Sequence, residues 1–180
     1  MNQKKDFQDN AALSGEKEAW NFALKILGIS PKSRNEMLER LKTKGFDAAL
    51  AEKTVGRLEV AGYLNDRALA LSLVSRMASS RKGFGKRKAA FELKRRGFEP
   101  GAASEALEEL TSDVQREAAE ALVQSVWEKA KKLEPLKRKK KLFDTLVRRG
   151  FDFEIAKHVI ETFIRKAGDE ARDDVSGDFF

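Results

Sequence analysis

The sequence contains no cysteine in its 180 residues, which excludes disulfide bonds and metal sites built from thiolates. A chain without cysteine suits the reducing cytoplasm, where we expect this protein to act. No apolar run approaches the roughly 20 residues that span a membrane, so we expect no membrane association. The polar start of the chain, Met1-Asn-Gln-Lys-Lys, does not have the pattern of a signal peptide.

Histidine is almost absent, since His158 is the single example. In the repeat described below, His158 aligns with Lys53 and Glu105, which predicts a solvent-exposed position. A single histidine at such a position excludes His-rich metal sites and His-based nucleophilic triads. We therefore expect no metal and no other cofactor.

Only three prolines are present, and apolar residues recur at spacings of three and four, which predicts an all-α protein. An apolar share of 41% is enough for a core. Charged residues make up 36% of the chain, as in long helices with solvent-exposed faces. The net charge of +7 favours polyanionic partners.

A six-residue pattern, Leu-x-x-x-Gly-Phe, occurs three times in the chain. Its copies are Leu41–Phe46, Leu93–Phe98 and Leu146–Phe151, and their glycines are 52 and 53 residues apart. A period of this length is typical of stacked repeat proteins. The sequence thus predicts three tandem three-helix repeats, which complete their cores by stacking because units of about 50 residues are small for independent stability.

The repeat divides the chain into five segments. We expect a disordered leader over 1–15, repeats over 16–62, 63–111 and 112–168, and an acidic flexible tail over 169–180. The predicted helices cover 16–28, 34–44, 48–61, 66–81, 85–96, 100–110, 113–133, 136–149 and 153–167.

Capping residues support these helix boundaries. Two pairs fit a capping box, Ser33 with Glu36 and Ser112 with Gln115. The single caps are Asp47, Asn65 and Asp152, and Pro100 fits a first helical turn.

The repeated glycine is mainly a helix stop. A glycine directly after a helix adopts the left-handed conformation, and the phenylalanine that follows packs back on the leucine of the motif. The motif therefore predicts the fold and says little about function.

Basic residues at the start of two predicted helices are not explained by helix stability, because cations there oppose the helix dipole. Each such cation costs about 0.3–1 kcal/mol. At about 100° per residue, Arg87, Lys88, Lys94 and Arg95 fall on one face of the middle helix of repeat 2, with Phe91 among them and no acid. The same face of repeat 3 carries three cations and one acid, and that of repeat 1 carries a net negative charge. We therefore expect a cationic binding face on repeats 2 and 3 only.

Eleven residues of these two repeats are the predicted contacts to nucleic acid or filament, and each of them is basic. They are Lys82, Lys86, Arg87, Lys88, Lys94, Arg95, Lys137, Arg138, Lys140, Lys141 and Arg148. The alternative for such a face is an ordinary solvated helix surface. Phe91 is a candidate for base stacking, and its alternative is a packing contact with a neighbouring helix.

Motifs for catalysis are weak. Gly83-Phe-Gly-Lys86 superficially resembles a phosphate loop, but Ser80 stands where the first glycine is needed and Arg87 where Ser or Thr is needed. Carboxylates such as Glu105, Glu108 and Glu109 have the spacing of ordinary helix surfaces. We predict that the protein is not an enzyme. A Mg²⁺-dependent nuclease is the remaining enzymatic alternative.

Several short motifs together resemble the RecX family, the regulators of RecA recombinase. They are Gly62-Tyr-Leu-Asn-Asp66, Ala68-Leu-Ala70, Arg76, Gly83 through Lys86-Arg87 to Glu92-Leu93, and Arg96-Gly97-Phe98, together with Ser33–Leu38 and Lys44-Gly45-Phe46 in repeat 1. The resemblance covers about residues 16–167. Two departures are mild: Leu69 replaces a frequent aromatic residue, and Asn65-Asp66 replaces a common Asp-Asp.

The resemblance implies a curved, elongated array of three-helix repeats. It also implies binding along the groove of a RecA–DNA filament, with interference in ATP turnover and strand exchange during recombination and repair. The expected partners are the RecA filament and single- or double-stranded DNA, and we expect a monomer. A general DNA-binding protein without a RecA partner, and a helical adaptor for an acidic protein, are the alternatives.

Overall fold

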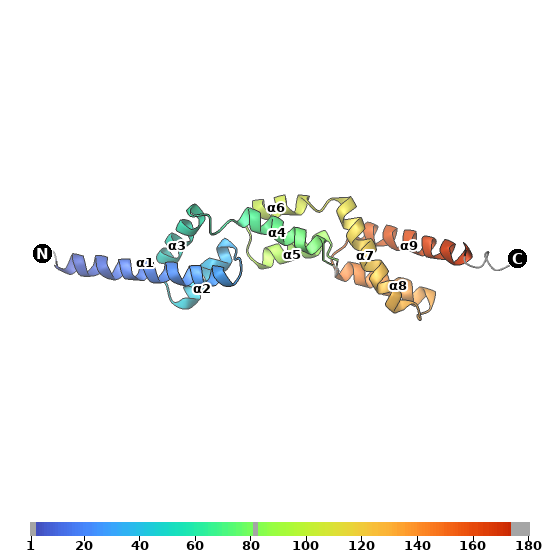
Figure 1. Ribbon diagram of the computed structural model, residues 1–180, viewed down its shortest axis with the longest axis horizontal. Helices are drawn as coiled ribbons and strands as arrows, with labels where there is room; N and C mark the ends of the chain where they lie inside the picture. The colour runs from blue at the N-terminus through green and yellow to red at the C-terminus, as the bar shows by residue number, and fades with distance from the viewer. Residues whose placement is uncertain (1–2, 81–82, 174–180) are drawn as a thin grey trace. The chain divides into compact units, whose positions relative to one another are not determined.

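The computed structural model describes the backbone of residues 3–80 and 83–173 and the side chains of residues 13–80 and 83–168. Within these ranges the structure is made of nine α-helices and contains no strand (Figure 1). The all-α helical repeat array predicted from the sequence is therefore confirmed. In the described residues no helix is long and apolar enough to cross a membrane.

The helices follow the predicted ones closely. They are α1 (Gln3–Ile29), α2 (Arg34–Lys44), α3 (Ala48–Val60), α4 (Asp66–Ala78), α5 (Lys86–Arg95), α6 (Pro100–Glu108), α7 (Ser112–Ala130), α8 (Pro135–Arg148) and α9 (Phe153–Asp173).

Two compact units divide the chain. Unit 1 comprises the chain up to Ala70 together with Leu93–Ala103, and unit 2 comprises Leu71–Glu92 and the chain from Ser104 onward. The division falls within α4, α5 and α6, so these helices contribute residues to both units. The three repeat boundaries given above stay a prediction from the sequence period.

The core of unit 1 is formed by α1, α2 and α3. Its buried residues are Ala19, Ala23, Met37, Leu38, Leu41, Ala51, Val55, Leu58 and Leu64. Small alanines on α1 let this helix approach the larger side chains of α2 and α3. Trp20 and Phe22 lie at the edge of this core, where Trp20 meets Tyr63 edge to face with ring centroids 6.0 Å apart.

The core of unit 2 repeats this pattern with α7, α8 and α9. Its buried residues are Ala119, Leu122, Val123, Leu142, Leu146, Phe151, Ala156, Val159 and Ile160. Leu146 and Phe151 of this core belong to the third copy of the repeated motif. At its edge Trp127 packs on Phe163, with ring centroids 5.3 Å apart.

The predicted helix stops are confirmed at all three copies. Gly45, Gly97 and Gly150 have φ values of 105°, 70° and 86°. After each glycine, the phenylalanine amide donates to the carbonyl of the motif leucine at 3.1–3.2 Å, the long hydrogen bond of a Schellman ending.

Two helix ends differ from the prediction by more than three residues. α1 begins at Gln3, inside the segment expected to be a disordered leader, because residues 3–14 contain neither glycine nor proline and continue the helix. α9 continues to Asp173, into the predicted flexible tail. The rest of that tail, residues 174–180, and residues 1–2 of the leader lie outside the described residues.

The capping predictions are mostly confirmed. The Ser33–Glu36 capping box is present, and Asp47 and Asn65 accept amides of their helices at 2.8 and 2.9 Å. The Ser112–Gln115 pair was wrong. Thr111 is the cap of α7, and its hydroxyl accepts the Val114 amide at 3.3 Å. The side chain of Gln115 is buried and makes contacts of another kind, described below.

Candidate nucleic-acid interface

The N-terminus of α2 meets the C-terminus of α5 within unit 1. The Ser33 hydroxyl donates to the Arg96 carbonyl at 2.6 Å, and the Asn35 side chain donates to the Gly97 carbonyl at 2.5 Å. A Cβ on Gly97 would lie 2.9 Å from Cβ of Asn35, so the two helix ends are closely packed. Side chains of one helix start thus satisfy the free carbonyls at the end of another helix.

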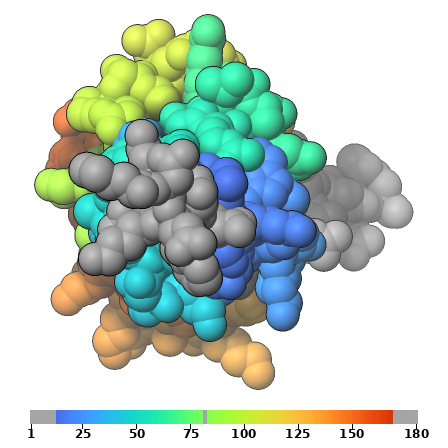
Figure 2. All heavy atoms as spheres, turned by 90° about the vertical axis from the view of Figure 1, so that its left-hand side faces the viewer, coloured from blue at the N-terminus to red at the C-terminus, as the bar shows by residue number. Residues whose placement is uncertain are grey.

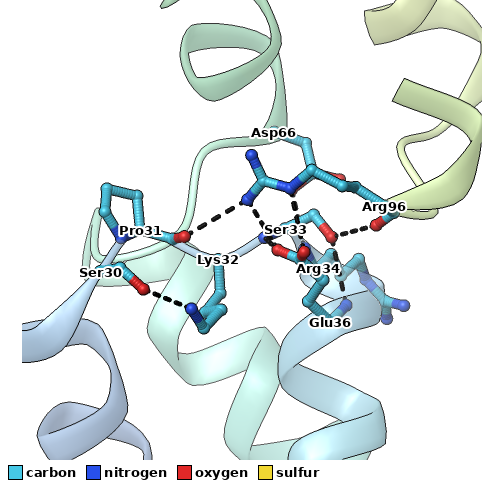
Figure 3. A network of polar contacts seen from close by, with 8 residues as sticks. All are labelled: Ser30, Pro31, Lys32, Ser33, Arg34, Glu36, Asp66 and Arg96. Carbon is cyan, nitrogen blue, oxygen red and sulfur yellow. Dashed lines mark hydrogen bonds and ion pairs between the residues drawn. The ribbon is translucent and has the colours of Figure 1, made fainter. Parts of the chain in front are cut away.

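Arg96 completes this junction, as Figure 3 shows. Its guanidinium donates to the two carboxylate oxygens of Glu36 at 2.9 and 2.7 Å and to the Pro31 carbonyl at 3.3 Å. Glu36 also accepts the backbone amide of Ser33 at 2.9 Å. Burial alone would raise the pKa of Glu36, but the hydrogen bonds from Arg96 and from the Ser33 amide outweigh it and lower this pKa.

Asp66, from the Gly62–Asp66 motif, lies at the same junction (Figure 3). It accepts the Arg34 backbone amide at 2.8 Å through one oxygen. Its other oxygen is buried and, among the described residues, has no hydrogen-bond partner. Burial is the main reason that the pKa of Asp66 is raised, and the charges of Glu99 and Glu36 add to the effect.

An equivalent junction in unit 2 joins the N-terminus of α5 to the C-terminus of α8. Backbone amides replace the side-chain donors here: Gly85 donates to the Arg149 carbonyl at 3.0 Å and Arg87 to the Gly150 carbonyl at 3.1 Å. A Cβ on Gly85 would lie 2.3 Å from the Gly150 oxygen, and a Cβ on Gly150 would lie 2.4 Å from the Lys88 nitrogen. Both glycines are therefore required by a close approach of two backbones.

Gln115 fixes this second junction from the side. Its carbonyl accepts the Lys86 amide at 3.2 Å, and its amide donates to the Leu110 carbonyl at 3.1 Å. Arg149 stacks on the Phe84 ring, with its guanidinium carbon 5.1 Å from the ring centroid. The role of Gln115 was missed from the sequence, because its spacing from Ser112 fits a capping box.

The junction supplies a structural reason for the basic start of α5. Lys86, Arg87 and Lys88 oppose the dipole of their own helix, but their backbone lies against the C-terminal carbonyls of α8. Cations are favourable at this negative end of a helix. Part of the cost inferred from the sequence is therefore offset by tertiary structure.

The structure places most of the predicted contact residues at the surface. Exposed side chains are those of Arg87, Lys94, Arg95, Lys137, Lys140, Lys141 and Arg148, and half-buried ones are those of Lys86, Lys88 and Arg138. Lys82 lies outside the described residues. Within the described part of the chain, Arg87, Lys94, Lys140, Lys141 and Arg148 form no ion pair with a carboxylate, so their charges are available to a polyanion.

Several of the predicted residues are engaged within the protein. Lys88 pairs with Glu92 at 3.3 Å and Lys137 with Glu134 at 3.7 Å, while Arg138 stacks on Trp127 at 4.3 Å from the ring centroid. The charge of Lys88 is therefore partly neutralised, because an i,i+4 spacing lets Glu92 reach it.

Phe91 is 57% exposed, which does not fit burial against a neighbouring helix. The Lys88 ammonium lies 4.9 Å from the centroid of its ring. Base stacking by Phe91 stays a prediction. His158 is exposed, as expected, and the described residues hold no group of side chains suited to bind a metal ion.

A basic cluster in unit 1 was missed. Lys25, Lys32, Arg40 and Lys44 line one pocket between α1 and α2, although repeat 1 was expected to carry no cationic face. Helical periodicity predicts the faces of single helices, whereas this cluster combines residues of two helices and the loop between them. Periodicity therefore does not reveal it.

Comparison with known proteins identifies the family. The family models for the first and third three-helix domains of RecX match residues 19–58 and 113–160. The chain is 31% identical over 153 residues to the regulatory protein RecX of Pelodictyon phaeoclathratiforme, covering 84% of this chain and 92% of the relative. It is 33% identical over 160 residues to the regulatory protein RecX of Chlorobium limicola, covering 87% of this chain and 96% of the relative.

Solved structures share the fold. The crystal structure of RecX from Lactobacillus salivarius matches with a TM-score of 0.75 at 20% identity, covering 83% of this chain and 97% of that one. A second crystal structure of a regulatory protein RecX matches with a TM-score of 0.78 at 19% identity, covering 88% of this chain and 78% of that one. At such identities the likeness concerns the fold alone. The identity to the sequence relatives shows that this chain belongs to the RecX family of regulatory proteins.

Proposed function

We propose that the protein is a non-enzymatic regulator that binds the RecA–DNA filament and mostly inhibits its ATPase and strand-exchange activities. The observation that carries the proposal is membership of the RecX family over most of the chain. Regulation of RecA is the role that this resemblance implies, within recombination, DNA repair and the SOS response.

The exposed cations of α5 and α8 support a DNA component of this binding. Each phosphate that a lysine or arginine neutralises releases a condensed counterion, which favours association. The two helices are held at their ends by the junction of Gly85 with Arg149 and of Arg87 with Gly150. Cations on a rigid helix bind phosphates with less loss of conformational freedom than cations on a mobile loop.

The experiment is a titration of the protein into RecA that hydrolyses ATP on single-stranded DNA, together with a strand-exchange assay. We expect inhibition at substoichiometric protein, since one regulator bound to a filament affects several protomers. No effect at equimolar protein would reject the proposal.

A general DNA-binding protein without a RecA partner is the second candidate, favoured by the exposed cations alone. It would bind DNA with a log affinity that falls linearly with log salt, yet leave ATP hydrolysis by RecA unchanged beyond competition for DNA. Repeating the ATPase titration with DNA in large excess separates the two, because only a filament-specific regulator keeps its effect.

A further inference from the structure

The pocket between α1 and α2 has no role in the proposed function. It has a volume of about 450 Å³ and is lined by two kinds of residue. We call the apolar ones, Phe22, Ile26 and Ile29, its floor and the basic ones, Lys25, Lys32, Arg40 and Lys44, its rim. In Figure 2 the blue side chains of α1 lie beside the lighter blue and cyan ones of α2. None of the described residues that line the pocket is acidic.

The two carboxylates of α2 form their ion pairs outside this rim, although Lys32 is close enough to Glu36 to help lower its pKa. Glu36 binds Arg96, and Glu39 pairs with Lys42 at 3.8 Å. In the described part of the chain, Lys25 and Arg40 have exposed side chains and make no ion pair. Four positive charges at one opening thus attract an anion.

The floor of the pocket favours an occupant that also carries an apolar group. Ile29 is 80% exposed, although it is a large aliphatic residue next to Ile26 and Phe22. The Lys44 ammonium lies 5.8 Å from the centroid of the Phe22 ring, so a cation and an aromatic surface meet at the edge of the pocket. An occupant that covers Ile29 removes apolar surface from water.

We propose that this pocket binds a short acidic peptide segment of a partner protein, with an aromatic or aliphatic side chain on the floor and carboxylates on Lys25, Lys32, Arg40 and Lys44. Nucleic acid fits less well, because the polar edges of a base on the floor of Phe22, Ile26 and Ile29 would lose water without gaining hydrogen bonds. An aromatic or aliphatic side chain has no polar edge, so it loses no hydrogen bonds to water there.

The test uses a fluorescein-labelled peptide, Asp-Asp-Ser-Asp-Phe-Phe-Ser-Asp-Asp, and the full-length protein in a fluorescence anisotropy titration. We expect saturable binding that weakens at least tenfold when both phenylalanines of the peptide are serine, since its charge is unchanged. Ile29→Glu and the double change Lys25→Glu with Arg40→Glu should each weaken binding at least tenfold. Lys17→Glu and Val60→Glu, at exposed positions outside the pocket, should change it less than twofold.

Two results would overturn the proposal. One is equal binding of the phenylalanine and serine peptides, which would mean that charge alone acts. The other is a single-stranded oligothymidylate that binds in the same titration and is weakened tenfold by Ile29→Glu, which would make the pocket a nucleic-acid site. Circular dichroism of each variant shows whether the helices are retained, and all substituted positions are exposed.

Discussion

Arg96 binds both carboxylate oxygens of Glu36 across 60 residues of sequence, at 2.7 and 2.9 Å. The side chains are 15% and 29% exposed, so the pair is largely shielded from water. It ties the end of α5 to the start of α2, where Glu36 also completes the capping box of α2. One ion pair therefore couples a local helix signal to a contact between distant parts of the chain.

A double-mutant cycle with Glu36→Gln and Arg96→Met should reveal this coupling. We expect a stabilising interaction of about 1–2 kcal/mol, between the values of exposed pairs and those of buried charged hydrogen bonds. Urea unfolding followed by circular dichroism provides the free energies. The exposed i,i+3 pair Lys131–Glu128 is the control and should couple by about 0.3–0.5 kcal/mol; a similar value for both pairs would contradict the prediction.

Acid should weaken the same contact. The pKa of Glu36 is lower in the folded protein than its ordinary value of about 4.3, so its contribution is present above that pH and is lost as the pH falls through the folded-state pKa. The difference in unfolding free energy between wild type and Glu36→Gln should therefore be constant near neutral pH and shrink below about pH 4.3.

The comparison with Glu36→Gln removes most of the opposite effect of Asp66. Its raised pKa means that protonation stabilises the folded state, a contribution that is lost as the pH rises through that pKa. Asp66 is present in both proteins and most of its contribution cancels in the difference, because burial raises its pKa more than the charge of Glu36 does. A difference that grows on acidification would contradict the pKa assigned to Glu36.

Gly85→Ala should destabilise the protein by about 1–3 kcal/mol, because the new Cβ meets the backbone of Gly150 at 2.3 Å and the two helix ends must move apart. Thermal unfolding measures the loss. Gly101→Ala, on α6 with nothing within 4 Å of its added Cβ, should leave stability unchanged or raise it by up to about 1 kcal/mol. Equal effects at the two glycines would mean that the α5–α8 junction is not closely packed in solution.

Reversing Lys140, Lys141 and Arg148 to glutamate should weaken DNA binding without loss of helicity, since all three are exposed. If each contacts one phosphate of duplex DNA, the slope of log affinity against log salt should become shallower by about 2–3. Filter binding or anisotropy at several salt concentrations measures it. Inhibition of RecA should fall in parallel.

The control for this variant reverses Lys17, Lys157 and Arg165, which are exposed and lie outside α5 and α8. It changes the net charge equally. If both variants lose affinity alike, overall charge and not the α5 and α8 residues governs binding.

The repeated motif made the fold predictable. Leu41, Leu93 and Leu146 are all buried, and each following glycine ends its helix as expected. These signals are local, because a helix cap involves residues within one turn of each other. The surface position of most predicted cations followed from helical periodicity in the same way.

Contacts between helices could not be predicted in this way. Gln115 looked like a partner of Ser112 in a capping box, and it instead binds the start of α5, 29 residues earlier in the chain. The cluster of Lys25, Lys32, Arg40 and Lys44 likewise becomes visible only when α1 and α2 are packed together.

By itself, the sequence determined the nine helices of the described chain, most of their ends and the threefold repeat, since periodicity and capping act over a few residues. Tertiary structure decided which helix ends meet, which cations are already paired and where charge gathers beside apolar surface. Those outcomes depend on distances between residues far apart in the chain, and backbone approaches such as Gly85 to Gly150 set these distances.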